Sequence, residues 1–333
     1  MTTGTGPPAA AIIGAGLMGK WHAIAAVRAG ARIAIVVDPD RAAASALAAR
    51  FPGSRAAASI DGIDELTVSV AHVCTPVADH PETAGALLDA GVHLLVEKPL
   101  AASAEASAAL LARAAAAKRL LCPVHQFGFQ RGVQQAIRAV CDIGPVLHFD
   151  FVICTAGASS EAARRVLIES VLPHPLSLIS HFLLAPVSGL DWHVLDRVPG
   201  ELRAIAGAGS ATVSILLSTS GRPTTNELTL ICERGTIAID LFHGFSVVEG
   251  SAVSRARKMT RPMVRSATIL SAAAANLVVR AARRQAAFPG LYELTERFYR
   301  AVADGAPSPI SSSEVMAIAV ARDRILASAM IDR

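Results

Sequence analysis

Three glycines near the start of the chain have the spacing of a loop that holds a phosphate. Gly14, Gly16 and Gly19 form G-x-G-x-x-G directly after an apolar run and directly before a helical stretch. In such a loop the first glycine allows a tight turn, the second lets a pyrophosphate approach the backbone, and the third lets the helix pack closely on the strand. The helix beginning at Leu17 and Met18 would direct its unpaired N–H groups at the phosphates.

An aspartate follows at the distance expected of a ribose-binding carboxylate. Asp38 lies 19 residues after Gly19, at the end of an apolar run that starts at Arg32. A carboxylate there can accept hydrogen bonds from both hydroxyls of an adenosine ribose. Its charge would repel a 2′-phosphate, which favours NAD over NADP, while Arg41 could receive that phosphate and keeps NADP possible. The alternative is a glycine-rich turn without a ligand. That alternative does not explain why the strand, the glycines, the helix and the acidic residue follow one another at the expected spacing.

A lysine after a later apolar run could act on a substrate oxygen. Lys98 is one of four lysines in the chain and follows Val92–Val96 and Glu97. A lysine at the carboxyl end of a central parallel strand lies at the mouth of the ligand crevice. Its ammonium could hydrogen-bond a substrate oxygen and stabilise negative charge as a carbinol becomes a carbonyl. The alternative is a surface lysine at the end of a strand.

The elements that must position these residues alternate between strand and helix. Short continuous apolar runs predict buried parallel strands, and helical patterns lie between them. Residues 1–122 are therefore expected to form an NAD(P)-binding Rossmann domain with a doubly wound parallel sheet. The predicted strands are Ala9–Ile13, Ile33–Val37, Val68–Cys74, Val92–Val96 and Leu120–Val124, and the predicted helices are Leu17–Ala29, Arg41–Arg50, His80–Ala90 and Ala104–Ala117.

Residues 123–333 follow a different pattern, in which strands succeed one another without intervening helices. This predicts a substrate-binding and oligomerisation domain with an open-faced, mainly antiparallel sheet and helices. An apolar open face is normally buried against another subunit, so we expect a homodimer or homotetramer. The predicted strands are Val146–Cys154, Leu202–Ala206, Ala211–Ser218, Glu227–Cys232, Thr236–Asp240 and Ser246–Val248, and helices are predicted at Gln130–Val140, at Ala162–Leu184 with an interruption at its prolines, and at about 264–285, 290–304 and 312–330.

Together with the glycine loop, Cys74-Thr75-Pro76, His80 and Glu97-Lys98-Pro99 closely resemble the glucose–fructose oxidoreductase / inositol dehydrogenase (Gfo/Idh/MocA) family. The resemblance extends over nearly all of residues 9–125. It implies an NAD(P)-dependent oxidoreductase whose cofactor contacts include Thr75, Pro76, His80, Glu97 and Lys98. It also implies a cis bond before Pro99, and a sugar, cyclitol or nucleotide sugar as the small-molecule substrate, held between the two domains.

The second half of the family's site departs from the family pattern. In Ser170-Val-Leu-Pro-His174 the histidine is present, and the resemblance makes His174 a general acid/base. Ser170 and Ser177 stand where relatives have carboxylates, so His174 should be a weaker base and both serines are candidate substrate contacts. Gln126, just after the last predicted strand of the Rossmann domain, is a further candidate substrate contact. The alternative for His174 is a structural histidine at a proline kink.

Composition limits the other possibilities. No apolar stretch reaches the roughly 20 residues of a spanning helix, the longest being Ala267–Val279, so no transmembrane segment is expected. The N-terminus lacks the pattern of a signal peptide. Five cysteines without C-x-x-C indicate reduced thiols in a cytoplasmic protein, and the histidines show no metal-ligand spacing, so no metal site is expected.

The net charge of +4 conceals a strongly basic segment. Residues 251–292 hold eight basic and no acidic side chains. This segment could be a solvated helix face, an oligomer contact, a site for an anionic substrate or an anionic membrane surface. Nucleic acid is not expected, because no aromatic side chain precedes Phe288 in the segment.

Three functions remain open. The leading one is an NAD(P)-dependent dehydrogenase or reductase in which Lys98 polarises the substrate oxygen and His174 moves the proton. The second is an NAD-binding protein without catalysis, acting as a sensor or assembly partner, which the missing aspartate motivates. The third is a reductase of a less polar ketone or imine, because serines replace carboxylates around His174.

Overall fold

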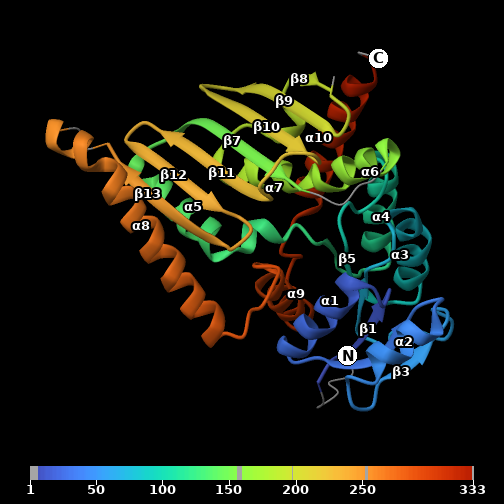
Figure 1. The fold of residues 1–333 in the computed structure, drawn as a ribbon. Helices are drawn as coiled ribbons and strands as arrows, with labels where there is room; N and C mark the ends of the chain where they lie inside the picture. Colours follow the sequence, from blue (N-terminus) through green and yellow to red (C-terminus); the bar gives the residue numbers. More distant parts are fainter. Residues whose placement is uncertain (1–6, 156–159, 197, 252–253, 332–333) are drawn as a thin grey trace. The chain divides into compact units, whose positions relative to one another are not determined.

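The computed structural model describes residues 7–155, 160–196, 198–251 and 254–331. The chain divides into two compact units, the first made of Met1–Val124 and Leu291–Ala319 and the second of His125–Gly290 and Val320–Arg333. The division after Val124 lies two residues beyond the boundary expected from the sequence. Unlike that expectation, residues 291–319 are part of the first unit, because helix α9 (Leu291–Asp304) buries Leu294 and Phe298 and packs against the first helix (Figure 1).

The first unit is built on a six-stranded parallel sheet, which confirms the predicted Rossmann-like architecture. The strand order is β3-β2-β1-β4-β5-β6, so the direction of strand succession reverses between β1 and β4. Strand β3, which has three residues, was not predicted because its sequence Arg-Ala-Ala forms no apolar run. The strands are β1 (Ala9–Ile13), β2 (Arg32–Val37), β3 (Arg55–Ala57), β4 (Val70–Val73), β5 (His93–Val96) and β6 (Leu121–Pro123).

Helices between these strands begin where the sequence places polar caps. The Asp40 carboxylate accepts hydrogen bonds from two backbone N–H groups of helix α2, and Ser103 does the same for one N–H of α4. Alanine-rich faces allow these helices to lie close to the sheet. The helices of this unit, besides α9, are α1 (Leu17–Arg28), the 3-10 turn η1 (Val77–Asp79), α2 (Arg41–Ala48), α3 (His80–Asp89) and α4 (Ala104–Ala116).

The second unit is built on a seven-stranded sheet of order β13-β12-β11-β7-β10-β9-β8. All neighbours are antiparallel except β7 and β10, which are parallel, so the predicted mainly antiparallel sheet is confirmed. One face buries Phe149, Phe151 and Leu228, whereas Ile205 on the other face is exposed. The strands are β7 (Val146–Cys154), β8 (Trp192–Leu195), β9 (Glu201–Ala208), β10 (Ala211–Ser218), β11 (Thr225–Cys232), β12 (Gly235–Asp240) and β13 (Phe245–Gly250), of which β8 was not predicted.

Prolines divide the helical segment of this unit as the sequence predicts. Helix α6 (Glu161–Val171) ends at Leu172, and α7 (Pro173–Phe182) begins with Pro173 in its first turn, where a missing N–H costs no hydrogen bond. The remaining helices of this unit are η2 (Gln126–Phe129), α5 (Arg131–Ile143), η3 (Val187–Gly189) and α8 (Arg255–Ala282), and α10 (Ser312–Ile331) belongs to the first unit up to Ala319 and to the second from Val320.

Helix α8 is longer than predicted. It begins at Arg255 rather than near residue 264, and Pro262 lies inside it (Figure 1). Within the described chain one helix, over Lys258–Ala282, is long and apolar enough to cross a membrane by length and composition, and little of it is buried. The run Ala267–Val279 expected from the sequence is shorter, because Arg265 and Arg280 bracket it. A single helix of this kind is weak evidence for a membrane span.

Candidate functional site

The glycine loop after β1 has the geometry that its sequence predicts. Gly14 has φ +98°, and its N–H donates to the carbonyl of Val37 at 2.8 Å. A Cβ at Gly14 would lie 2.7 Å from the carbonyl oxygen of Cys74. A Cβ at Gly19 would lie 1.9 Å from the carbonyl oxygen of Gly14. Both positions therefore exclude any side chain, for the reasons of turn geometry and helix–strand packing expected from the motif.

Gly16 differs from the other two glycines, because open space surrounds it. No heavy atom lies within 4 Å of where its Cβ would be. Among the described residues no side chain caps the start of α1 at Gly16, and no acidic residue lies in the first turn of the helix. Leu17 is exposed beside it. The loop thus offers backbone N–H groups and space to an external anion.

Asp38 lies against this loop. Its Oδ2 accepts the N–H of Ala15 at 2.8 Å, and its Oδ1 accepts the N–H of Asp40 at 2.8 Å. The carboxylate therefore ties the end of β2 to the glycine loop after β1. An oxygen with two lone pairs can accept a second hydrogen bond, so these contacts leave capacity for ribose hydroxyls.

The turn after β4 carries Thr75, Pro76 and His80. The hydroxyl of Thr75 is buried and has no hydrogen-bond partner among the described residues. The two ring nitrogens of His80 face backbone carbonyls, with Nε2 2.9 Å from the Thr75 oxygen and Nδ1 3.1 Å from the Pro99 oxygen. His80 therefore braces the ends of β4 and β5 against each other, whereas the Thr75 hydroxyl remains available to a ligand.

Glu97 ends a chain of buried hydrogen bonds that the sequence analysis missed. Its Oε1 lies 3.1 Å from Nε2 of His22, whose Nδ1 lies 2.9 Å from Nδ1 of His72. Nε2 of His72 lies 3.0 Å from the hydroxyl of Tyr299. Two proton arrangements satisfy every contact. In one, Tyr299 donates to His72, His72 to His22, and His22 to Glu97; in the other, a protonated His22 donates to both Glu97 and His72, and His72 donates to Tyr299.

The electrostatics of these buried groups decide the charge on His72 and Glu97. Burial and the neighbouring His22 hold the pKa of His72 well below its ordinary value, and burial raises the pKa of Tyr299. Burial by itself would raise the pKa of Glu97, but hydrogen bonding and charge interaction with His22 and Lys98 hold it below the ordinary value. The ring of His72 is therefore neutral and Glu97 is ionised at neutral pH.

Lys98 follows Glu97 directly, and its backbone N–H donates to Oε2 of Glu97 at 3.1 Å. The Lys98–Pro99 peptide is cis, as the resemblance implied. Burial lowers the pKa of the Lys98 ammonium, and the Glu97 carboxylate raises it. The net effect is a lowered pKa, and the carboxylate partly offsets the effect of burial and so favours the charged form of the lysine.

In the second unit, His174 lies in the first turn of α7. The imidazole is buried and stacks on Phe127 of η2, with ring centroids 4.1 Å apart and an interplanar angle of 11°. The hydroxyl of Ser177 donates to the carbonyl of His174 at 2.8 Å. Ser170 lies on the preceding helix, and its hydroxyl donates to the carbonyl of Leu167 at 2.8 Å. These two bonds connect the serines to backbone carbonyls, so neither bond takes the place of a carboxylate on the imidazole.

The η2 turn brings Gln126 to the same region of the second unit. Gln126 is buried, and α7 packs on η2 through the Phe127–His174 stack and through His181, whose Nε2 would lie 2.4 Å from a Cβ at Gly128. Burial lowers the pKa of His181. The structure therefore gathers Gln126, His174 and Ser177, which the sequence separates by about fifty residues.

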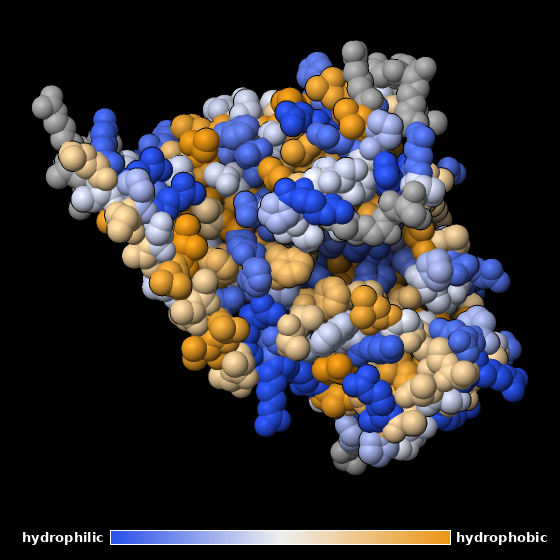
Figure 2. Space-filling model, in the orientation of Figure 1, coloured by the Kyte–Doolittle hydropathy of each residue, from blue (hydrophilic) through white to orange (hydrophobic). Residues whose placement is uncertain are grey.

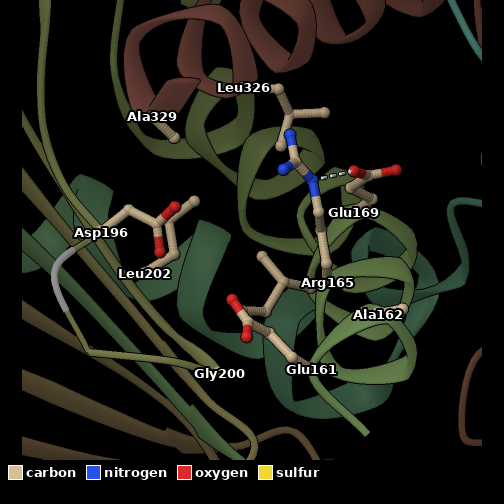
Figure 3. A pocket seen from close by; sticks show the side chains of 10 residues that line it. Glu161, Ala162, Arg165, Glu169, Asp196, Gly200, Leu202, Leu326 and Ala329 are labelled. Carbon is tan, nitrogen blue, oxygen red and sulfur yellow. Dashed lines mark hydrogen bonds and ion pairs between the residues drawn. The ribbon is translucent and has the colours of Figure 1, made fainter. Parts of the chain in front are cut away.

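Two hollows on the second unit lie apart from these residues. One, of 370 Å³, lies between α6, α10 and the β8–β9 connection and is lined by Glu161, Arg165, Glu169 and Asp196 among others (Figure 3). Arg165 pairs with Glu169 at 3.2 Å across its wall. The other, of 740 Å³, lies between β13 and the first half of α8. In the described part of the chain no group of three or more His, Cys, Asp or Glu residues could hold a metal ion.

The first unit fits a dinucleotide. Gly16 has open space above the loop, the start of α1 lacks a capping side chain in the described structure, and Asp38 is fixed at the loop. The buried hydroxyl of Thr75 provides an additional polar group. These are the features that phosphate and ribose recognition require at the switch point of a doubly wound sheet.

Comparison with known proteins supports the same interpretation. The model of an oxidoreductase family with an NAD-binding Rossmann fold, Gfo/Idh/MocA, matches residues 9–125. Inositol 2-dehydrogenase 1 of Mycolicibacterium vanbaalenii is 36% identical over 252 residues, which is 69% of this chain and 72% of that protein. Inositol 2-dehydrogenase of Leifsonia xyli subsp. xyli is 32% identical over 203 residues, 57% of this chain. The chain spans only 58% of the Leifsonia protein's length, and 35% and 63% of two further inositol 2-dehydrogenases.

Solved structures share the whole fold. Levoglucosan dehydrogenase in complex with NADH and levoglucosan has a TM-score of 0.77 at 16% identity, covering 98% of both chains. UDP-N-acetylglucosamine 3-dehydrogenase of Acidithiobacillus ferrooxidans has a TM-score of 0.76 at 17% identity, covering 97% of both chains. At such identities these two similarities establish the fold only.

Proposed function

The chain belongs to the Gfo/Idh/MocA family of oxidoreductases with an NAD-binding Rossmann fold, and from that premise we propose that it is an NAD-dependent dehydrogenase of a sugar or cyclitol. The observation that carries the proposal is the fixed contact between Asp38 and the glycine loop, beside the open space at Gly16. Inositol and levoglucosan, which name relatives of this chain, define the class of substrate to test first.

NAD is the proposed cofactor in preference to NADP. Asp38 presents a carboxylate where the adenosine ribose would bind, and a 2′-phosphate there would be repelled. Arg41 is exposed at the start of α2, one residue after the capping Asp40, and in the described structure it forms no hydrogen bond or ion pair with Asp38. When bound, the nicotinamide would supply the chemistry of hydride transfer with a carbinol or carbonyl carbon.

Lys98 and His174 are the proposed catalytic residues. The Lys98 ammonium, kept charged by Glu97, would donate a hydrogen bond to the substrate oxygen and stabilise its developing negative charge. His174 would accept the proton of the carbinol during oxidation and return it during reduction. Its stacking on Phe127 fixes the ring plane, and Gln126 and Ser177 nearby are proposed substrate contacts.

A second candidate function follows from the missing carboxylate. Ser170 bonds to Leu167 on its own helix, and no acidic side chain stands at that motif position. A protein that binds NAD without catalysis, or a reductase of a less polar ketone or imine, would need no such carboxylate. We further propose a reducing, cytoplasmic location, which five free thiols support.

The experiment is turnover of purified protein with NAD or NADH against myo-inositol, levoglucosan, UDP-sugars, and small ketones and imines. Oxidation of a polyol or sugar, reduced about 10²-fold or more in Lys98→Ala with a smaller change in NAD affinity, supports the proposal. Reduction of ketones or imines without oxidation of any polyol or sugar favours the reductase of a less polar ketone or imine. Tight NAD binding without turnover of any substrate favours the non-catalytic protein.

A further inference from the structure

Helix α8 carries an apolar stripe that faces away from its own chain. Met259, Met263, Leu270 and Leu277 are 84%, 77%, 72% and 68% exposed. Their spacing of four, seven and seven residues puts them on one face of the helix. Figure 2 shows hydrophobic side chains following the diagonal of this helix. Exposed apolar surface of this extent marks an interaction site in a folded protein.

The opposite face of α8 is the polar one, and it is held by the second unit itself. Arg261 and Arg265 each lie 3.0 Å from a different oxygen of Glu249 on β13. Asn276 and Arg280 donate to the carbonyl of His243. A solvated surface helix has the reverse orientation, with its apolar face toward the core. The outward apolar face therefore needs a partner that its own unit does not provide.

We propose that this face packs against the same face of a second copy of the chain, with the two α8 helices antiparallel. The stripe is symmetric about Leu270. Met263 and Leu277 lie seven residues to either side of it, Ser266 and Ala274 four residues, and Met259 and Ala281 eleven residues. In a two-fold antiparallel pair each residue meets its counterpart, so Leu270 meets itself, Met263 meets Leu277, and Met259 meets Ala281.

The size and charge of the stripe suit such a pair. In each copy, the four large and three small side chains of the stripe would together bury roughly 500 Å². The two copies would bury on the order of 1,000 Å² in total, which is the lower bound for a specific interface. The positions beside the stripe include Ala267, Ile269 and Arg280, and the guanidinium of Arg280 is bound by the carbonyls of His243 and Ala286 in its own unit. The arginines bound to Glu249 lie on the far face, so two copies would not place like charges against each other.

A bilayer surface fits the same helix less well. No aromatic residue lies between residues 251 and 287, whereas helices that lie in a membrane interface use Trp or Phe as anchors. Arg261 and Arg265 point to the sheet side, where anionic headgroups would not meet them when the apolar stripe is buried.

Cysteine cross-linking in a Cys141→Ser background, which removes the exposed native thiol, tests both the contact and its direction. Leu270→Cys should form a covalent dimer on oxidation. Met263→Cys and Leu277→Cys should each form little dimer alone but a heterodimer when mixed. Ala275→Cys, exposed on another face of α8, is the control and should remain monomeric. Self-linking at residue 263, or no link at residue 270, would overturn the proposal.

Sedimentation velocity of the full chain tests the energetics. A hot-spot side chain contributes about thirtyfold to affinity, and two-fold symmetry counts the change twice, so Leu270→Glu should weaken self-association by on the order of 10³-fold. Ala275→Glu should have no effect. Ile205→Glu, on the open sheet face, should leave the α8 cross-link intact. Dissociation by Ile205→Glu but not by Leu270→Glu would overturn the proposal, as would a monomeric protein whose binding to phosphatidylserine vesicles depends on Leu270.

Discussion

Replacing Gly19 by alanine should disturb both folding and cofactor binding. The new Cβ would lie 1.9 Å from the carbonyl oxygen of Gly14, whereas a carbon and a carbonyl oxygen in contact are about 3.3 Å apart. Backbone atoms on both sides define this contact, so no side-chain rotation can relieve it. The start of α1 must move away from the loop by more than about 1 Å.

The size of the effect follows from that displacement. Overpacking of a close-packed interior costs about 1–3 kcal/mol. For a unit of about 150 residues this corresponds to a fall in Tm of roughly 2–12 °C. Moving a preorganised group by about 1 Å can cost up to about 10²-fold in function. NAD affinity should therefore fall at least about 10-fold in Gly19→Ala, beyond any effect of partial unfolding.

Gly16→Ala is the matched control, because it adds the same methyl group three residues earlier. Gly16 has φ −68° and ψ −162°, which alanine tolerates, and its Cβ would meet no atom within 4 Å. Its Tm should match the wild type, while its NAD affinity falls because the methyl group occupies the proposed path of the pyrophosphate.

Scanning calorimetry and isothermal titration with NAD measure the two effects separately. An unchanged Tm in Gly19→Ala would refute the packing argument. Wild-type NAD affinity in Gly16→Ala would refute the placement of the pyrophosphate at this loop, even if Gly19→Ala behaves as expected.

Three further changes test other parts of the structure. Asp38→Ala should weaken NAD binding by about 10–100-fold and reduce the preference for NAD over NADP, since it removes a charged acceptor and the repulsion of a phosphate. Asp38→Asn removes the charge but keeps one of the two oxygens that accept the N–H groups of Ala15 and Asp40, and tighter NADP binding by the wild type would contradict the assignment. Tyr299→Phe leaves Nε2 of buried His72 without its hydrogen-bond partner and should cost about 1–3 kcal/mol of unfolding free energy in urea titration. An unchanged midpoint would show that the buried chain of bonds is absent. Burial and the charge of Arg119 lower the pKa of His93 to about 4, below its unfolded value of about 6.5, so the free energy of unfolding should be largest above about pH 6.5 and fall toward pH 4. His93→Asn keeps an acceptor for the N–H of Leu120 and should make this decline shallower. A decline identical to that of the wild type would refute the role of His93.

Local sequence patterns were sufficient to predict most helices and strands of both units. Strands β1, β7 and β10 have the predicted bounds, because a buried strand is a short apolar run ended by turn residues. Helix α8 begins earlier than predicted. Pro262 and the basic residues around it are unfavourable signals for a helix, although Met259 and Met263 continue the helical spacing of the apolar stripe. Strand β3 was missed because Arg55-Ala-Ala57 forms no apolar run, and β8 because His193 interrupts its apolar residues.

The candidate cofactor site was also readable in the sequence, because its parts lie close together in the chain. Gly14, Gly16 and Gly19 occupy positions where the backbone turns or must be approached closely and a side chain would interfere. Such positions appear in the sequence as glycines at fixed spacing. Asp38 lies one strand further on. The resemblance implied that His80 contacts the cofactor. Only the structure shows that both ring nitrogens of His80 face the backbone carbonyls of Thr75 and Pro99.

By itself the sequence determined the Rossmann sheet, the glycine loop and the acidic residue beside it, since each leaves a local pattern in the chain. Only the tertiary structure decided that Tyr299, 227 residues after His72, completes a buried hydrogen-bond chain to Glu97, and that residues 291–319 join the first unit. It also decided that the apolar face of α8 points outward. The reason is physical: a pattern records which side chains share a face, but which face is covered depends on packing partners distant in the chain.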